Sequence, residues 1–364
     1  MRIVYGVFGY GRGHATRAMG VLPQLSRRHE VLVFAGGTAY EMLAKDYPVV
    51  RIPTLSYIYD ASGALSARLT IAQNLPRVAD VLLEGAGFRE VVGTMRDFQP
   101  DLAICDVDPW THQAAARLGI PRISFDHYGI LVYCRLPIPA SDRLRHLRDV
   151  LSYRLLTGKP DRIVVSSFYH APATRPGVHC IGPLLRDAVL RAHASRGEHL
   201  LAYFNQPELL TPRVEEALHA LGLPVLIYGT PRTDSSGHVV FRPPSNQAFI
   251  DDLASCRALI GTAGNQLVGE ALYFGKPMLV MPEDSVEQRA NAAAVERLGI
   301  GVRTTRDKLT LAQLTQFLAA ERSFGELARA RARDGRAQAL QALEGFGREL
   351  TAGRTSAAPR WRYA

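Results

Sequence analysis

The sequence lacks three features that would assign it to a specialised class of protein. It has no run of about 20 apolar residues that could span a bilayer. Its first residues do not show the charged segment, apolar segment and cleavage site of a secretion signal. Its cysteines, at positions 105, 134, 180 and 256, form no CxxC pair, so we expect reduced core residues and no metal or redox centre. We therefore expect a cytoplasmic protein without a membrane span.

Lysine is also scarce. Only four of the 43 basic residues are lysines, so the net charge of +9 comes almost wholly from arginine. No basic block is interleaved with aromatic residues, and no helix-turn-helix or RNP pattern is present, so nucleic acid is not an expected partner. The positive charge suits anionic ligands, or peripheral contact with an anionic membrane surface. The oligomeric state stays open.

The 364 residues are enough for two domains. Apolar runs typical of buried parallel strands alternate with helical patterns, and the alternation restarts after the Gly-Pro break in IGPLLRD. The fold class is therefore α/β, with two Rossmann-like doubly wound parallel sheets that face each other across a cleft. We expect an N-terminal domain at 1–182, a C-terminal domain at 183–345, and a tail at 346–364 that crosses back or is disordered.

The loop GYGRGHATR follows the first expected strand. A dinucleotide site would need GxGxxG and an acidic residue at the end of the second strand, but this loop reads GxGxG and the second strand ends in FAGG. The loop instead lets a ligand approach through Gly11 and Gly13, beside His14 at the start of a helix. A histidine there tends to stay neutral and can accept a proton; the alternative is that His14 only caps the helix or packs.

Asp106 ends the apolar run DLAICD, where a carboxylate could orient His14 and stabilise its charged form. Asp108 follows, so that CDVDP also contains the DxD pattern of some metal sites. Since nothing else in the chain supports a metal, we expect none, and the role of Asp108 stays open.

A second motif begins at Gly261 and reads GTAGNQLVGEALYFGKPMLVMPEDSVEQRANAAAVERLGIG. It resembles the donor-site signature of GT-B glycosyltransferases over about 40 residues. The spacing is intact at Gly264, Gln266, Glu270, Ala271, Leu272, Gly275, Pro277, Pro282, Gln288, Asn291, Ala292, Gly299 and Gly301. GYGRGHATR resembles the N-terminal loop of bacterial and archaeal members of the family 1 and family 28 superfamily. The segment starting CDVDPW resembles the one that bears the aspartate partner of the catalytic histidine in family 1.

The resemblance implies an inverting, metal-independent glycosyltransferase with a GT-B fold and no cofactor. His14 would be the catalytic base and Asp106 its partner, and the donor would be a nucleotide-diphosphate sugar, UDP- or dTDP-linked. The resemblance also implies the donor-binding residues. They are Phe241 and Arg242 near the nucleobase, Glu270 at the ribose, Thr262, Gly264, Asn265 and Gln266 at the diphosphate, and Glu287 and Gln288 at the sugar. Helix N-termini suit the diphosphate.

Thr262 departs from the family pattern, because many members carry a histidine toward the diphosphate at this position. The phosphate contact would then come from the hydroxyl, from backbone N–H groups, or from an arginine such as Arg242 or Arg186.

The acceptor is not identified by the sequence and could be a small molecule, a glycan or a lipid-linked molecule. Residues expected on the acceptor side are Gly11, Gly13, Tyr57, His127 and Tyr128. The tyrosines suit stacking on a ring, or they pack structurally, and His127 is an alternative base.

In SDRLRHLRDVLSYRLL, the side chains of Leu144, Leu147 and Leu151 share one helical face among several arginines. This pattern predicts a surface helix with a core-facing stripe, and the alternative is docking to anionic lipid headgroups or to a phosphorylated acceptor.

Two other functions fit the same motifs. A nucleotide-sugar 2-epimerase or hydrolase would share the fold and donor site but need no acceptor. A non-catalytic nucleotide-sugar-binding protein would fit the missing histidine at Thr262, although the presence of His14, Asp106, Glu270 and Gln288 argues against it.

Overall fold

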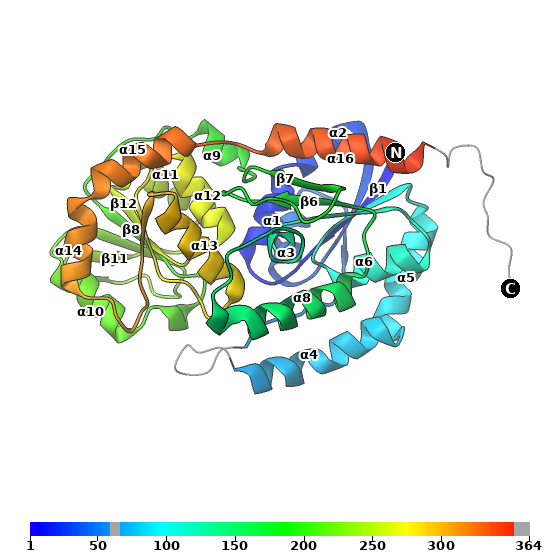
Figure 1. Cartoon of the computed structure of the whole chain (residues 1–364), viewed down its shortest axis with the longest axis horizontal. Helices are drawn as coiled ribbons and strands as arrows, with labels where there is room; N and C mark the ends of the chain where they lie inside the picture. Colours follow the sequence, from blue (N-terminus) through cyan, green and yellow to red (C-terminus); the bar gives the residue numbers. More distant parts are fainter. Residues whose placement is uncertain (59–65, 353–364) are drawn as a thin grey trace, which may run out of the picture.

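The computed structural model of the chain describes residues 1–58 and 66–352. Two α/β domains lie side by side, each built on one seven-stranded sheet with helices on both faces (Figure 1). The predicted fold class is confirmed. Within the described residues, no helix is both long enough and apolar enough to cross a bilayer.

The N-terminal sheet is parallel throughout and has the order β3-β2-β1-β4-β5-β6-β7. Its central strands are buried, as their continuous apolar runs predict. The strands are β1 (Arg2–Val7), β2 (Glu30–Ala35), β3 (Val49–Arg51), β4 (Leu102–Asp106), β5 (Arg122–Asp126), β6 (Arg162–Ser166) and β7 (Val178–Ile181). The helices of this half are α1 (Arg12–Met19), α2 (Leu22–Arg28), α3 (Gly37–Leu43), α4 (Ala67–Leu82), α5 (Ala86–Phe98), α6 (Pro109–Arg117), α7 (Gly129–Tyr133) and α8 (Arg143–Thr157), with a 3₁₀ turn, η1 (Ala140–Asp142).

The C-terminal sheet has the order β10-β11-β9-β8-β12-β13-β14, and only the short β10 runs antiparallel to its neighbour. Its strands are β8 (Leu200–Tyr203), β9 (Val225–Tyr228), β10 (Ser235–Ser236), β11 (Val239–Phe241), β12 (Ala258–Gly261), β13 (Met278–Val280) and β14 (Gly301–Arg303). The helices of this half are α9 (Asp187–Arg191), α10 (Pro212–Ala220), α11 (Asn246–Ser255), α12 (Asn265–Tyr273), α13 (Val286–Arg297), α14 (Leu311–Ala319) and α15 (Glu321–Arg331), with a 3₁₀ turn, η2 (Pro207–Leu209).

Two long helical patterns in the sequence are each divided in the structure. The helical pattern of residues 15–28 forms part of α1 and all of α2, which are separated at Gly20 and Val21 before the proline of α2. The pattern near 65–98 forms α4 and α5, because Glu84 takes a positive φ of 52° between them. A helix cannot continue through a left-handed residue, so the chain turns there.

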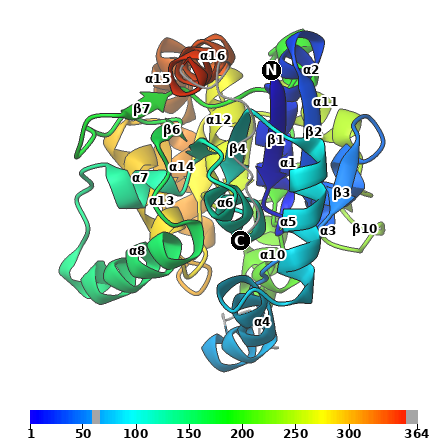
Figure 2. The same cartoon turned by 90° about the vertical axis from the view of Figure 1, so that its right-hand side faces the viewer.

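The last described helix, α16 (Arg336–Thr351), crosses back from the C-terminal domain and packs on the N-terminal sheet. Ala339 and Leu343 are buried in the same apolar cluster as Ile3 and Leu102. Figure 2 shows α16 along the top of this domain and α4 and α8 along its lower side. The expected boundary at residue 345 falls inside α16, and residues 353–364 of the expected tail lie outside the described residues.

The crossing of the two interdomain segments requires a glycine. A Cβ added to Gly335 would lie 2.2 Å from the carbonyl oxygen of Gly182. The Gly335 N–H also donates to the Pro183 carbonyl at 2.8 Å. Only glycine permits so close a backbone approach.

Candidate functional site

The segments that follow the carboxyl ends of β1 and β12 meet where the two domains join, and we call this junction the cleft. Each strand is followed by a short loop and a helix, α1 in the N-terminal domain and α12 in the C-terminal domain. The two helix starts are in contact, since a Cβ on Gly13 would lie 3.9 Å from the Cβ of Gln266. Gln206 Nε2 also donates across the cleft to the hydroxyl of Tyr10, at 3.3 Å. The two expected motifs are therefore brought together.

His14, Asp106 and Arg17 form one cluster at the N-terminal side of this cleft. His14 Nδ1 lies 2.9 Å from Asp106 Oδ1. Arg17 Nη2 donates to both carboxylate oxygens of Asp106, at 2.8 and 2.7 Å, and its Nε donates to Oδ2 at 3.1 Å. Asp106 and Arg17 are buried, whereas a quarter of the His14 side chain is exposed. The histidine therefore presents its free edge to the cleft from a buried ion pair.

The proton on His14 Nδ1 decides what the ring can do. The same nitrogen lies 2.9 Å from Arg17 Nη2, so it could donate to Asp106 or accept from Arg17, but not both. When Nδ1 donates to Asp106, Nε2 carries a lone pair and can act as a base. When Nδ1 accepts from Arg17, Nε2 carries the proton. The Asp106 carboxylate favours the first tautomer.

Burial alone would raise the pKa of Asp106, but the charge of Arg17, followed by His14 and its hydrogen bonds, outweighs burial and holds that pKa below its usual range. Burial likewise opposes the charge of Arg17, and the facing Asp106 carboxylate overcomes this and raises the pKa of Arg17. Asp106 is therefore ionised in the cleft, as a partner of a charged imidazole must be.

The turn after Asp106 separates the two carboxylates of the DxD pattern. Val107 has a φ of 54°, which is rare for a β-branched residue and stores strain at this turn. Asp108 caps α6 and accepts from the Thr111 N–H at 2.8 Å. Among the described residues, no group of three or more His, Cys, Asp or Glu side chains is arranged to hold a metal ion.

Both helices that start in the cleft lack a side-chain cap. The N-cap residues are Gly11 for α1 and Gly264 for α12, and neither helix has an acidic residue in its first turn. Gly11 has a φ of 75°, a conformation that glycine adopts without strain. Uncapped N–H groups and the helix dipoles create a positive potential that suits an anion.

Arg12 adds a positive charge beside these helix starts. Its side chain is exposed and forms no ion pair with any residue that the structure describes. Burial raises the pKa of Tyr203, and Arg12 is the strongest of the charges that act on this tyrosine. The charge of Arg12 therefore acts across the domain boundary on the end of β8.

The expected donor-site residues on α12 are close together but already paired. Glu270 is buried and forms a bidentate pair with Arg186, with Nε to Oε1 at 2.9 Å and Nη2 to Oε2 at 2.8 Å. Arg186 also donates to Asn246 Oδ1. Gln266 Nε2 donates to the Leu184 carbonyl at 2.7 Å and to Glu270 at 3.1 Å. The Thr262 side chain is buried in the loop that precedes α12.

Gln288 supports the same loop from α13. Its Oε1 accepts from the backbone N–H groups of Ala263 and Glu283, at 3.0 and 3.1 Å, and its Nε2 donates to the Glu283 side chain. Asn265 instead joins the two domains, since its Oδ1 accepts from the Phe168 N–H at 3.1 Å.

His127 also bridges the domains. Its Nδ1 lies 2.9 Å from the Ser166 carbonyl, and its Nε2 lies 3.1 Å from Asn291 Oδ1 and 3.3 Å from Glu287 Oε1. The Asn291 amide nitrogen is used by Glu287 and by the Ala263 carbonyl, which fixes Oδ1 toward the histidine. Both ring nitrogens therefore have polar partners within the protein, which argues against His127 as the base.

The remaining expected residues lie at different depths. Phe241 is buried in the C-terminal core under the Arg232 guanidinium, which lies 3.6 Å from its ring centre. Arg242 is half-exposed, with Nε 3.6 Å from Asp252. Tyr128 stacks on Tyr153 with ring centres 5.8 Å apart.

Tyr57 is 45% exposed and meets Tyr10 edge-to-face, with ring centres 5.3 Å apart. Residues 59–65, which follow Tyr57 closely in the sequence, lie outside the described residues.

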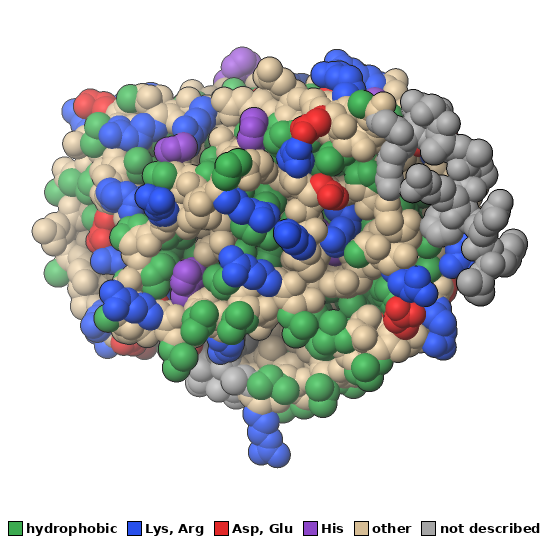
Figure 3. Space-filling view, turned by 45° about the vertical axis from the view of Figure 1, so that its right-hand side comes forward, with side chains coloured by type: hydrophobic (Ala, Val, Ile, Leu, Met, Phe, Trp, Pro, Cys, Tyr) green, Lys and Arg blue, Asp and Glu red, His purple; other side chains and the backbone are tan. Residues whose placement is uncertain are grey.

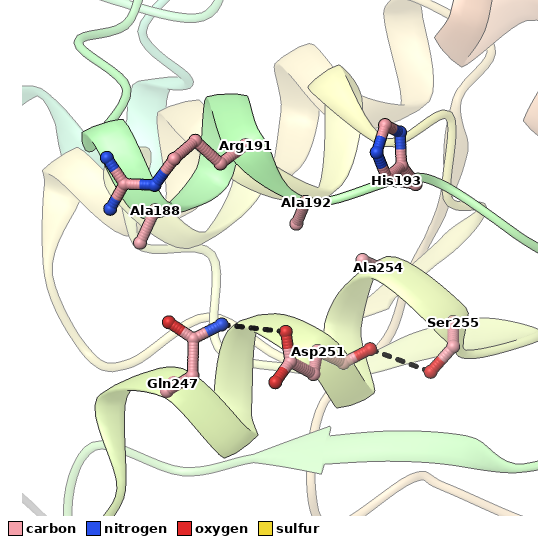
Figure 4. Close-up of a pocket in the computed structure, with 8 residues that line it drawn as sticks. All are labelled: Ala188, Arg191, Ala192, His193, Gln247, Asp251, Ala254 and Ser255. Carbon is pink, nitrogen blue, oxygen red and sulfur yellow. Dashed lines mark hydrogen bonds between the residues drawn. The ribbon is translucent and has the colours of Figure 1, made fainter.

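A pocket of about 450 Å³ lies elsewhere, between α9 and α11 (Figure 4). It is lined by Arg191, His193, Gln247 and Asp251, together with three alanines and Ser255. None of the residues expected for catalysis or donor binding lines it, so it is not part of the candidate site.

Sequence reasoning missed Arg17 and Arg12. A signal for Arg17 is present in GHATR, where the arginine follows His14 by three residues and so shares its helix face. Arg12 has no such signal, because its lack of a partner is visible only in the structure.

Arg17→Met should destabilise the N-terminal domain by about 3–5 kcal/mol, because it leaves the buried Asp106 charge without its main partner. Urea unfolding measures this. Arg27→Met, on the exposed side of α2, is the control and should change stability by less than about 0.5 kcal/mol. Arg17→Met combined with Asp106→Asn should recover much of the loss. Equal stability of Arg17→Met and the control Arg27→Met would contradict the assignment.

Asp108→Asn should stabilise the protein increasingly as the pH rises. Burial raises the pKa of Asp108 to about 7, above its unfolded value of about 3.9, so its contribution to stability is lost as the pH rises between these values. Asparagine keeps the helix cap but cannot ionise. The stability of the variant relative to wild type should therefore rise by about 2–3 kcal/mol from about pH 5 to pH 8. The exposed Asp46→Asn control should show no such trend, and parallel curves for wild type and Asp108→Asn would refute the prediction.

Comparison with known proteins identifies the family and the fold of this chain. Residues 1–321 match the family model described as glycosyl transferase family 1. An uncharacterised glycosyltransferase of Methanosarcina mazei is 25% identical over 338 residues, which cover 83% of this chain and 85% of that protein. Two solved structures share the fold: LpCGTa in complex with UDP (TM-score 0.67, 16% identity, 96% of this chain and 99% of that one), and the glycosyltransferase VinC in complex with dTDP (TM-score 0.62, 17% identity, 97% and 100%). Together with the paired seven-stranded sheets, these matches show that the chain belongs to glycosyl transferase family 1 and is a glycosyltransferase of the GT-B fold.

Proposed function

We propose that this protein is an inverting, metal-independent glycosyltransferase that moves a sugar from a UDP- or dTDP-linked donor to an acceptor hydroxyl. The acceptor is a small molecule, a glycan or a lipid-linked molecule, and the reaction takes place in the cytoplasm without a cofactor. The observation that carries the proposal is the position of the His14–Asp106 pair, beside two uncapped helix starts that face each other across the cleft.

The donor diphosphate binds at the start of α12. The N–H groups at the start of this helix are uncapped, and Arg12 supplies a positive charge from the opposite domain. Arg12 thereby takes the place of the histidine that many relatives carry at the position of Thr262, whereas Arg186 is held by Glu270. The complexes of LpCGTa with UDP and of VinC with dTDP support a uridine or thymidine donor.

The sugar transfer is a single displacement. His14 Nε2 removes the proton of the acceptor hydroxyl as its oxygen attacks the anomeric carbon from the side opposite the diphosphate. The bond between that carbon and the diphosphate oxygen breaks, and the nucleoside diphosphate leaves with the electron pair, so the configuration inverts. Asp106 stabilises the imidazolium that forms, and the helix starts with Arg12 stabilise the leaving group.

Glu270 and Gln288 act from the C-terminal domain. Glu270 Oε1 accepts from both Arg186 and Gln266, whereas Oε2 accepts from Arg186 alone and keeps a second lone pair, with which it accepts from a ribose hydroxyl. Gln288 holds the loop at Ala263 in the conformation that exposes the first N–H groups of α12.

His14→Ala should lower the rate of sugar transfer by about 10²–10⁴-fold, which is the usual contribution of a positioned base. The assay measures UDP or dTDP release from UDP-glucose and dTDP-glucose, with water or a panel of phenols and sugars as acceptors. Asp106→Asn should also lower the rate of sugar transfer. Both variants should bind UDP with unchanged affinity in calorimetry.

The exposed His170→Ala is the control and should keep full activity. Full activity of His14→Ala would overturn the assigned role. Incubation with donor alone adds a second criterion, since accumulation of an epimer of the donor sugar would show an epimerase instead.

Arg12→Met should weaken the binding of UDP or dTDP about tenfold, because a charge-assisted hydrogen bond to phosphate is lost. The affinity for the nucleoside alone should not change, since it carries no phosphate. Calorimetry with UDP and uridine, and with dTDP and thymidine, measures both, with Arg27→Met as control. Equal weakening for the nucleoside and the diphosphate would show that Arg12 does not contact the phosphates.

A further inference from the structure

The leucines of α8 point away from the protein. Leu144, Leu147, Leu151 and Leu155 are 78, 53, 57 and 58% exposed, and their spacing puts them on one face of the helix. The opposite face packs inward through His146, Val150, Tyr153 and Thr157. The expected core-facing stripe is therefore wrong: the apolar face of this helix is its outer face.

The neighbouring helix α4 extends this apolar area. Leu69, Ile71, Leu75 and Leu82 of α4 and the adjacent Leu83 are also exposed. In the described part of the chain, twelve large apolar side chains are exposed, and nine of them belong to these two helices and Leu83. We call the outer face of these elements the α4–α8 surface. In Figure 3 apolar side chains gather along the lower edge of the molecule, where Figure 1 places the two helices.

The α4–α8 surface is also basic. The two helices carry six arginines against two aspartates. Asp149 is paired with Arg148, and Asp80 accepts a hydrogen bond from the buried Trp110. Arg143 and Arg154 flank the leucine stripe and have no ion-pair partner among the described residues. Exposed leucines bordered by unpaired arginines match the chemistry of an anionic phospholipid surface.

The surface lies beside the cleft on the acceptor side. The Arg145–Asp284 and Arg289–Asp142 ion pairs join the start of α8 to the C-terminal domain next to α13. Tyr128 stacks on Tyr153 of the same helix, with ring centres 5.8 Å apart. A bilayer on this surface would therefore lie next to the residues expected to face the acceptor.

We propose that the α4–α8 surface docks the protein on an anionic phospholipid bilayer. The leucines enter the boundary between headgroups and acyl chains, and the arginines contact the phosphates. A single surface leucine needs no explanation, but an outward stripe on two adjacent helices does. The contact is peripheral and independent of sugar transfer, so it can fail while the proposed function holds.

The test is flotation of the full-length protein with phosphatidylcholine vesicles, with and without phosphatidylglycerol, in the absence of donor. We expect binding only to the anionic vesicles and weaker binding at high salt, because salt screens exposed charges. Leu147→Asp combined with Leu151→Asp should reduce the bound fraction at least about tenfold. Arg143→Gln combined with Arg154→Gln should reduce it less, and should reduce its salt dependence.

Matched controls keep the result interpretable. Leu311→Asp combined with Leu327→Asp changes exposed leucines on the C-terminal domain, and Arg27→Gln combined with Arg322→Gln changes exposed arginines outside the surface. Both should bind vesicles like wild type. No binding of wild type to anionic vesicles would overturn the proposal. A dimer in light scattering that the α8 leucine variant dissociates, without vesicle binding, would also overturn it and assign the surface to a second copy.

Discussion

The buried ion pair between Asp106 and Arg17 is the constraint on which the site depends. A carboxylate at the end of a central strand and without access to water would be strongly destabilising if unpaired. Arg17 neutralises it from α1, with two donor nitrogens on the two carboxylate oxygens. This fixes the rotation of α1 relative to β4, and it thereby sets where the glycine loop and His14 face the cleft.

The same ion pair shapes the electrostatics of His14. In a simple histidine–aspartate pair the carboxylate charge acts on the imidazole alone, but here Arg17 shares it. The Asp106 carboxylate stays ionised over a wider pH range, and part of its charge is already compensated before the ring takes up a proton. The ion pair therefore holds His14 in a fixed position, but Asp106 stabilises a protonated His14 ring less than an unshared carboxylate would.

Polar contacts between the domains keep the second half of the site in place. His127, Asn265 and Asn291 connect the ends of N-terminal strands to α12 and α13. The loop at Ala263 is held by Gln288 on one side and by Asn291 on the other. Several residues that belong to the donor-site signature therefore support the loop that precedes α12.

Much of this protein follows from the sequence alone. Continuous apolar runs alternating with helical patterns are enough to predict two parallel sheets, because strands buried on both faces have no polar side. Motif spacing places His14, Asp106 and the start of α12 at strand ends, which must meet if the domains face each other. Periodicity also identifies the leucine stripe of α8, but it cannot say which side of the helix meets the core. Only the tertiary structure shows that this stripe faces outward, that Arg17 pairs with Asp106 and that Arg186 pairs with Glu270. Each depends on which side chains from distant segments reach one another, and sequence spacing constrains neighbours only within an element.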